Sequence, residues 1–284
     1  MKNIIVPIDF SDESLKGLQV AVLFSKKQNT NIQLVYVKKK SNDYRPVSFE
    51  EERKFAEKKM EQIIEETKPS LGNDSTLEFI IKKGKIYQEI VSQAESVKDP
   101  LIVMSTHGAS GFEELFIGSN AFKLLSATEI PVITINKGEC PKEINRIVMP
   151  IDVSPKSRQK VSYTAEMARL FGAEIHVVSV TSSEGRRINH KVKAYSNQVA
   201  GYLQSLKLPV ILDSIKGDAL TDIIIEYAVK VNAELISTMK DTSSSFNFLS
   251  GNYTHDLVNK APMLTLNVTP KVLGYAGSFS TFGG

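Results

Sequence analysis

The chain repeats itself, and the repeat limits the folds that it can adopt. The segment NIIVPIDFSDES at residues 3–14 returns as NRIVMPIDVSPKS at residues 145–157. Near the other end of each half, PVITIN at 131–136 returns as PMLTLN at 262–267. Self-similarity of this kind indicates a duplicated domain, so a fold expected for the first half must also suit the second.

The length agrees with two domains, because 284 residues correspond to about two units of ordinary size. We place an N-terminal domain at residues 1–138 and a C-terminal domain at 144–270, with a seam near KGECPKE at 137–143. Residues 271–284 are rich in glycine and serine, a composition that predicts a flexible tail.

Each half alternates strand-like and helix-like segments. Ser11 is a suitable N-cap for a helix that runs to about residue 27, and Ser154 followed by Pro155 fits the same rule in the second half. A charged amphipathic helix is expected over about 49–67. The other strands and helices of the first half are expected at residues 4–9, 32–37, 77–83, 87–97, 101–105, 120–128 and 131–136. This alternation predicts an α/β protein with two tandem Rossmann-like, doubly wound domains, each a five-stranded parallel sheet in the order 3-2-1-4-5 with helices on both faces.

Composition excludes several other classes of protein. The 35 Lys and Arg residues are interspersed with 32 Asp and Glu, so no basic face for nucleic acid is expected. No apolar run approaches the roughly 18 residues of a membrane span, and acidic residues follow the N-terminus too soon for a signal peptide. The single cysteine, Cys140, cannot form an internal disulfide, and the four histidines make no metal-binding pattern. We therefore expect a cytoplasmic protein with no nucleic-acid or membrane partner.

The fold predicts a ligand site where the first and fourth strands end. Open parallel sheets bind ligands at the carboxyl ends of their strands, at the point where strand order reverses. The first strand ends at Asp9, and the fourth runs through Ser105 into a loop that contains Gly108. Glycine lets backbone amides approach a ligand closely, and Gly118-Ser119 precede a helix whose amino end favours an anion.

These motifs resemble those of the universal stress protein family. The family's ATP-binding pattern is Gly, two residues, Gly, nine residues, Gly, and then Ser or Thr; here nine residues separate Gly108 from Gly118-Ser119. The turn VPIDFS at 6–11 is similar to the family's hydrophobic-Pro-x-Asp-x-Ser turn. Ser105 stands where the family has its first glycine, which places a Cβ in the expected ribose wall. The resemblance extends through both copies, so the chain resembles a tandem universal stress protein.

The resemblance implies that ATP or a related adenine nucleotide, with or without Mg²⁺, binds the N-terminal domain. The implied binding residues are Pro7, Asp9, Val37, Met104, Ser105, Gly108, Gly118, Ser119 and Asn120. Asp9 and the main chain near Val37 would meet the adenosine. Met104 and Ser105 would lie along the ribose, and the last four residues would surround the phosphates.

No recognisable catalytic set accompanies this loop. His107 is a candidate base, but packing or capping within the loop is the interpretation that we favour. No Ser-His-Asp set, paired carboxylates or P-loop lysine motif emerges from the sequence. We therefore expect a binding protein with at most slow ATP hydrolysis.

The corresponding loop of the second half lacks these features. Met239-Lys240-Asp241-Thr242 replace the segment that leads to Gly108, and only Gly251 remains, followed by Asn252. Side chains would block close approach of the backbone, and Asp241 would repel a phosphate. An alternative stays open, in which the Lys240 ammonium binds an anion. We expect the C-terminal domain to be degenerate.

The last strand of each half predicts how the halves meet. Both 131–136 and 262–267 carry apolar residues and no charge, and in the expected order both are sheet edges. Exposed apolar edges favour association, so we expect the two strands to pair antiparallel, which makes the chain a pseudo-dimer. Homodimerisation of the whole chain is compatible with this arrangement.

The sequence therefore predicts a stress-response regulatory protein that binds an adenine nucleotide in its first half. The alternative is an interaction scaffold of the same family that binds no nucleotide. Either would act through protein partners that the sequence does not name.

Overall fold

A computed structural model describes the chain apart from residues 39–48, 109–117, 137, 182–184, 241–252 and 271–284. The expected tail and most of both ligand-site loops therefore lie outside the described residues. The first half contains β1 (Asn3–Pro7), α1 (Asp12–Ser25), β2 (Asn31–Lys38), α2 (Phe49–Thr67), η1 (Lys68–Ser70), β3 (Thr76–Lys83), α3 (Ile86–Glu95), β4 (Pro100–Ser105), α4 (Ser119–Ala127) and β5 (Val132–Ile135). The second half contains β6 (Arg146–Ile151), η2 (Pro155–Arg158), α5 (Val161–Phe171), β7 (Glu174–Thr181), α6 (Arg186–Ser205), β8 (Val210–Lys216), α7 (Leu220–Lys230), β9 (Leu235–Met239), α8 (Tyr253–Lys260) and β10 (Leu264–Val268).

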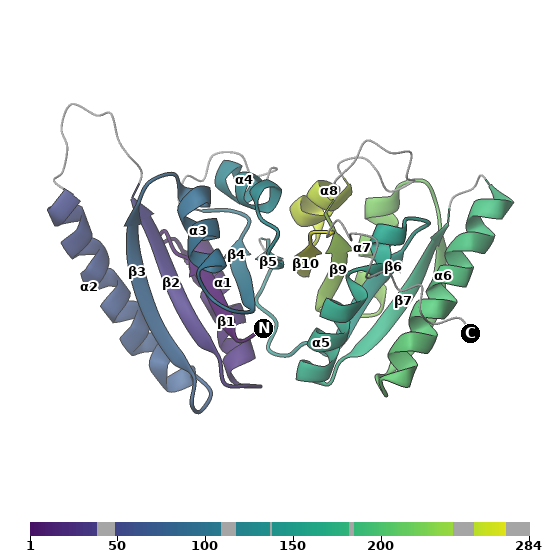
Figure 1. The fold of residues 1–284 in the computed structure, drawn as a ribbon, viewed down its shortest axis with the longest axis horizontal. Coiled ribbons are helices and arrows are strands. Elements are labelled where there is room, and N and C mark those ends of the chain that lie inside the picture. Colours follow the sequence, from purple (N-terminus) through teal and green to yellow (C-terminus); the bar gives the residue numbers. More distant parts are fainter. Residues whose placement is uncertain (39–48, 109–117, 137, 182–184, 241–252, 271–284) are drawn as a thin grey trace.

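The strands form one ten-stranded sheet in the order β3-β2-β1-β4-β5-β10-β9-β6-β7-β8. Each half contributes a parallel sheet in the expected order, and the two orders run in opposite directions from the centre (Figure 1). The central pair, β5 and β10, is antiparallel, with Thr134 opposite Thr265. The predicted α/β class and the predicted antiparallel pairing of the two edges are confirmed.

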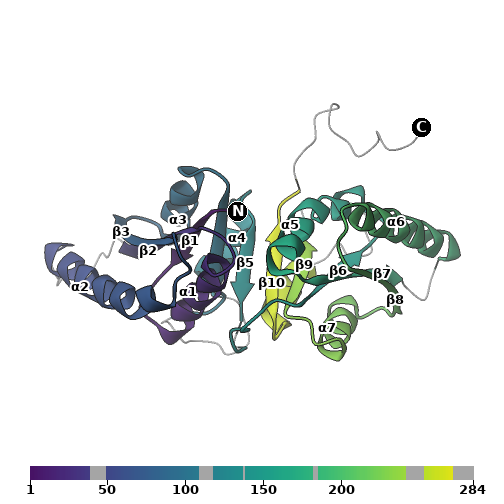
Figure 2. The same ribbon diagram turned by 90° about the horizontal axis from the view of Figure 1, so that it is seen from below.

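Helices cover both sides of the sheet in each half (Figure 2). In the first half, α1 and α2 bury Phe24 and Met60 against one face, whereas α3 and α4 bury Ile90 and Leu124 against the other. The strands β1, β2, β4 and β5 bury side chains on both faces, as doubly wound sheets require, whereas the edge strand β3 is only partly buried. None of the helices in the described residues is long and apolar enough to cross a membrane.

The helix after β1 begins as expected, but its counterpart in the second half does not. The Ser11 hydroxyl accepts a hydrogen bond from the Ser14 amide at 3.2 Å, so Ser11 is the N-cap of α1. We expected Ser154 and Pro155 to start the matching helix. Instead, residues 155–158 form the 3₁₀ turn η2, and α5 begins only at Val161.

One of the differences between these two segments offers a physical reason. Lys160 corresponds in the repeat to Gly17, where an added Cβ would meet the Val103 carbonyl oxygen at 3.3 Å and the Met104 Cα at 3.4 Å. A Cβ at that position would force the helix or the strand to shift, so glycine favours the close approach of α1 to β4. In the second half the lysine side chain occupies the space, and the chain makes a tighter turn before the helix starts.

Candidate functional site

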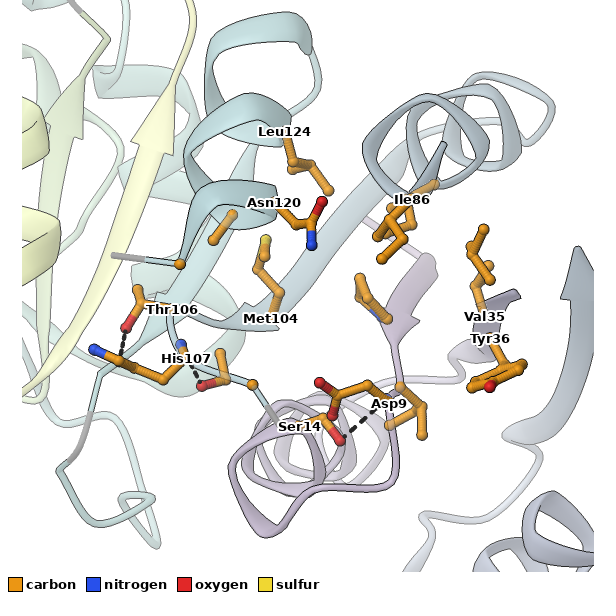
Figure 3. Close-up of a pocket in the computed structure, with 18 of the residues that line it drawn as sticks. Asp9, Ser14, Val35, Tyr36, Ile86, Met104, Thr106, His107, Asn120 and Leu124 are labelled. Atoms are coloured by element: carbon orange, nitrogen blue, oxygen red, sulfur yellow. Dashed lines mark hydrogen bonds between the residues drawn. The ribbon is translucent and has the colours of Figure 1, made fainter. Parts of the chain in front are cut away.

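A solvent-open cavity with about 790 Å³ of free space lies at the carboxyl ends of β1 and β4 (Figure 3). These two strands are neighbours, and the elements that follow them lie on opposite faces of the sheet. This is the switch point at which doubly wound sheets bind their ligands.

The nine residues that the sequence predicts for the site all line this one cavity. They are Pro7, Asp9, Val37, Met104, Ser105, Gly108, Gly118, Ser119 and Asn120. They come from β1, β2, β4, the start of α4 and the adjoining turns, so the fold brings together segments more than a hundred positions apart. Their roles in binding stay a prediction.

The turn after β1 fixes the Asp9 carboxylate at the edge of the cavity. Asp9 Oδ1 accepts hydrogen bonds from the Ser11 amide at 3.1 Å and from the Ser11 hydroxyl at 2.5 Å. Between them Phe10 has a φ of +67°, a conformation that non-glycine residues adopt rarely. The carboxylate is thus held by its own turn, and its exposed side faces the cavity (Figure 3).

Gly108 brings the backbone of the second loop against this carboxylate. A Cβ added at Gly108 would lie 2.5 Å from Asp9 Oδ2, closer than any real contact of that kind. Because Gly108 has no side chain, its main chain can lie directly against the Asp9 carboxylate at the cavity wall. The sequence predicted the glycine from its motif, and the close approach to Asp9 gives its physical reason.

The amino end of α4 forms the opposite wall. Gly118 is the N-cap and donates its amide to the Thr106 carbonyl oxygen at 2.8 Å. Among the residues that the structure describes, no side chain caps this helix, so the first-turn amides of α4 can bind an acceptor in the cavity. Ser119 is the first helical residue and is exposed, so its hydroxyl does not serve as the cap. A free helix amino end is a suitable place for an anion.

Ser105 and His107 belong to the turn between β4 and the loop. The Ser105 hydroxyl accepts a hydrogen bond from the His107 amide at 3.1 Å, so the extra atoms that replace glycine stabilise the turn. His107 Nδ1 lies 2.9 Å from the Thr106 hydroxyl. This contact agrees with a capping role for His107. Within the described residues no group of three His, Cys, Asp or Glu side chains could hold a metal ion.

The sequence missed much of the apolar wall. Val35, Ile86, Ile90 and Leu124 also line the cavity, between the end of β2 and the helices α3 and α4. Ile86 and Ile90 are one helical turn apart at the start of α3, so their spacing was a usable signal once the sheet order was known. An apolar slot beside polar groups is the usual composition of a small-molecule site.

Tyr36, near the end of β2, also lines the cavity. Its ring stacks on Phe10 with centroids 4.9 Å apart, and its hydroxyl donates a hydrogen bond to Glu52 at 3.0 Å. Burial and then the Glu52 carboxylate raise the pKa of Tyr36 to about 12. Tyr36 is therefore a neutral positioning group at physiological pH.

In the second half, Asp152 is equivalent to Asp9, and the side chain of Lys160 lies near it. The Lys160 ammonium is fully buried and donates a hydrogen bond to the Pro150 carbonyl oxygen at 2.6 Å. Burial lowers the pKa of Lys160 to about 8, while the Asp152 carboxylate acts in the opposite direction. A side chain of this chain thus lies beside Asp152, where the first half has open space beside Asp9.

Fold and site together define a duplicated Rossmann-like protein with an open cavity in its first half. The model of the Universal stress protein family matches residues 1–136. The first half is thus a universal stress protein domain, and the second half repeats its strand order.

Individual relatives agree with this assignment. Universal stress protein MJ0531 of Methanocaldococcus jannaschii is 29% identical over 146 residues, which cover 48% of this chain and 82% of that protein. Universal stress protein YxiE of Bacillus subtilis is 28% identical over 144 residues, which cover 47% of this chain and 97% of that protein. The crystal structure of a universal stress protein from Archaeoglobus fulgidus covers 95% of this chain and 97% of its own, with a TM-score of 0.75 at 17% identity. That last likeness supports the complete two-half fold.

Proposed function

We propose that this chain is a stress-response regulatory protein that binds ATP, or a related adenine nucleotide, in the cavity of its N-terminal half. One observation carries the proposal: the Gly108 backbone lies against the Asp9 carboxylate at one end of a cavity whose other wall is the amino end of α4. A hydrogen-bond acceptor for hydroxyl groups and a set of amide donors for an anion thus face the same space. A phosphorylated nucleoside has both kinds of group.

The cavity suggests an orientation for the nucleotide. The base would enter the apolar side, between Val37, Ile86 and Ile90, and the ribose hydroxyls would donate to Asp9. The phosphates would meet the first turn of α4, near Gly118, Ser119 and Asn120. Any accompanying Mg²⁺ would be bound mainly by the phosphates, as is usual for this ion.

The C-terminal half would not bind nucleotide in this way. The first half places open space next to Asp9, whereas the second half buries the Lys160 side chain next to Asp152. Because the residue types also supply no evident base, the nucleotide would act as a regulatory ligand or a slowly hydrolysed one. A cytoplasmic location fits such a role.

Isothermal titration calorimetry with a matched pair of variants tests the proposal. Gly118→Glu places bulk and negative charge at the phosphate wall and should abolish ATP binding without loss of the folded state. Gly201→Glu makes the same change on α6, where an added Cβ meets nothing within 4 Å, and should bind like the wild type. Equal affinity of the wild type and Gly118→Glu would refute the site. A wild type that binds no adenine nucleotide would favour the scaffold alternative.

A further inference from the structure

Helix α4 connects the cavity of the first half to the second half. Its first residues, Ser119 and Asn120, line the cavity, and its other end lies beside β10 and α8 (Figure 1). Along its length, the Phe122 ring packs edge-on against His255 of α8, with centroids 5.0 Å apart. Anything that shifts α4 therefore also shifts the wall of the cavity.

Lys240 of the second half holds the carboxyl end of α4. Its ammonium donates hydrogen bonds to the carbonyl oxygens of Ser126, at 2.5 Å, and Thr128, at 3.4 Å. The Lys240 amide donates to the Val268 carbonyl oxygen at 2.8 Å, which fixes the lysine beside the central strand β10. The Thr269 hydroxyl adds a third donor, 3.0 Å from the Thr128 carbonyl oxygen.

These contacts satisfy a general need of helices. The last carbonyl groups of an α-helix have no partner within the helix, and the helix dipole places partial negative charge there. A cation and a hydroxyl from the second half meet both requirements for α4. The sequence left open that the Lys240 ammonium binds an anion, and the structure instead places this ammonium on the carbonyl groups of α4.

The repeat shows that this arrangement is one-sided. Lys240 corresponds to Thr106 of the first half, whose hydroxyl contacts Asn136 and Ile135 within its own domain. The carboxyl end of α8 receives an amide instead, because Asn136 Nδ2 donates to the Asn259 carbonyl oxygen. The cationic contact thus runs from the second half to the first, toward the half that has the open cavity.

We propose that Lys240 is a positioning residue for the nucleotide cavity, through which the C-terminal half orders α4 and the donors at its amino end. This inference rests on the proposed function for its ligand. Through the Lys240 contact, the second half would contribute to the site in the first half although it binds no nucleotide itself. By linkage, a nucleotide bound at the amino end of α4 strengthens the Lys240 contact at the carboxyl end.

Two measurements on the full chain test this role in Lys240→Met. Hydrogen exchange of the α4 amides in the ligand-free protein should become faster, while exchange in the rest of the first half stays unchanged. Affinity for ATP should fall by about fivefold or more, a typical coupling between linked sites. Lys240→Arg, which keeps the cation, should restore both. Lys230→Met removes an exposed lysine from the end of α7 and should change neither.

The outcomes separate this inference from the proposed function. A wild type that binds no ATP overturns the proposed function, and the α4 exchange rates still decide whether Lys240 orders the helix. A wild type that binds ATP with the same affinity as Lys240→Met overturns the positioning role. Faster exchange spread over the whole domain would also overturn it, because that result indicates general destabilisation.

Discussion

The hydroxyls of Thr134 and Thr265 meet 2.6 Å apart at the centre of the ten-stranded sheet. The two threonines occupy the same position of the repeat and lie directly opposite each other in the antiparallel pair. Because equivalent residues face each other, the pair lies on the local pseudo-twofold axis that relates the two halves. Each threonine is 1% exposed, so the pair is inside the core. Asn267 Nδ2 also donates to the Thr265 hydroxyl at 3.0 Å.

We predict that this pair is strongly non-additive. Thr134→Val or Thr265→Val alone removes the hydrogen bond between the two hydroxyls and leaves the other hydroxyl with only Asn267 Nδ2 as a donor, so it should lower the free energy of unfolding by about 1–2 kcal/mol. The double variant removes both hydroxyls, and Asn267 Nδ2 keeps the Val132 and Thr265 carbonyl oxygens as acceptors. Its loss should therefore be smaller than the sum of the single losses. Urea denaturation of the four proteins measures this, and simple additivity would contradict a coupled pair.

A second prediction concerns the close approach of Gly108 to Asp9. Gly108→Ala forces the carboxylate away from its position, because the new Cβ would lie 2.5 Å from Asp9 Oδ2. The variant should fold, since a side-chain end can rotate, but its affinity for ATP should fall by about tenfold, or about 1.4 kcal/mol. Gly201→Ala adds the same methyl group where nothing lies within 4 Å and is the control. Calorimetric titrations that give equal affinities for both variants would exclude a role for this contact.

Local sequence patterns predict most of this architecture because they are repeated. Alternating segments and the duplicated turn led to the strand order, and the apolar strand 131–136 led to the central pairing. The nine site residues were predicted because the motifs that contain Gly108 and Gly118 resemble those of the universal stress protein family. What local patterns do not contain is the distance between a helix and its sheet.

That distance explains the main error in the expected helices. Ser154 and Pro155 satisfy the local rules for a helix start. However, Lys160 has a large side chain where Gly17 lets helix α1 pack closely against strand β4. Ile86 and Ile90 of the cavity were missed for a similar reason. Their own segment does not show that α3 packs near the end of β2. This position becomes visible only in the assembled sheet.

The buried Lys160 leads to a prediction about pH. Its folded-state pKa, about 8, is below that of an unfolded lysine, so between about pH 8 and 10.5 the unfolded state binds more protons. The Lys160 contribution to stability should therefore rise with pH across this window, by at most about 3.4 kcal/mol. Below pH 8 the cost of burying the ammonium is fully present.

Lys160→Met isolates this effect, because other titrating groups cancel in the difference between the two proteins. The free energy of unfolding of the wild type relative to Lys160→Met should increase from pH 8 to pH 10.5. Chemical denaturation at several pH values gives the difference directly. A difference that stays flat, or falls, over this range would show that the ammonium does not titrate from a buried position.

The final prediction uses the duplication as its own control. Asp9 and Asp152 are equivalent, and each accepts a hydrogen bond from the amide two residues later, at 3.1 Å from Ser11 and 2.8 Å from Ser154. Their surroundings differ, because Asp9 is exposed toward the cavity and Asp152 is 6% exposed beside Lys160. The same substitution should therefore affect ligand affinity in the first half and stability in the second.

Asp9→Asn keeps the turn but gives up the charge-assisted hydrogen bonds that we assign to the ribose hydroxyls, so affinity for ATP should fall by about tenfold with little change in stability. Asp152→Asn leaves the Lys160 ammonium with less compensation, so the free energy of unfolding should fall by about 1–3 kcal/mol with affinity unchanged. Calorimetry should give one ATP per chain for the wild type and for Asp152→Asn. Tighter binding by Asp9→Asn would mean that the carboxylate faces the phosphates instead, and two equivalent sites per chain would refute the asymmetry between the halves.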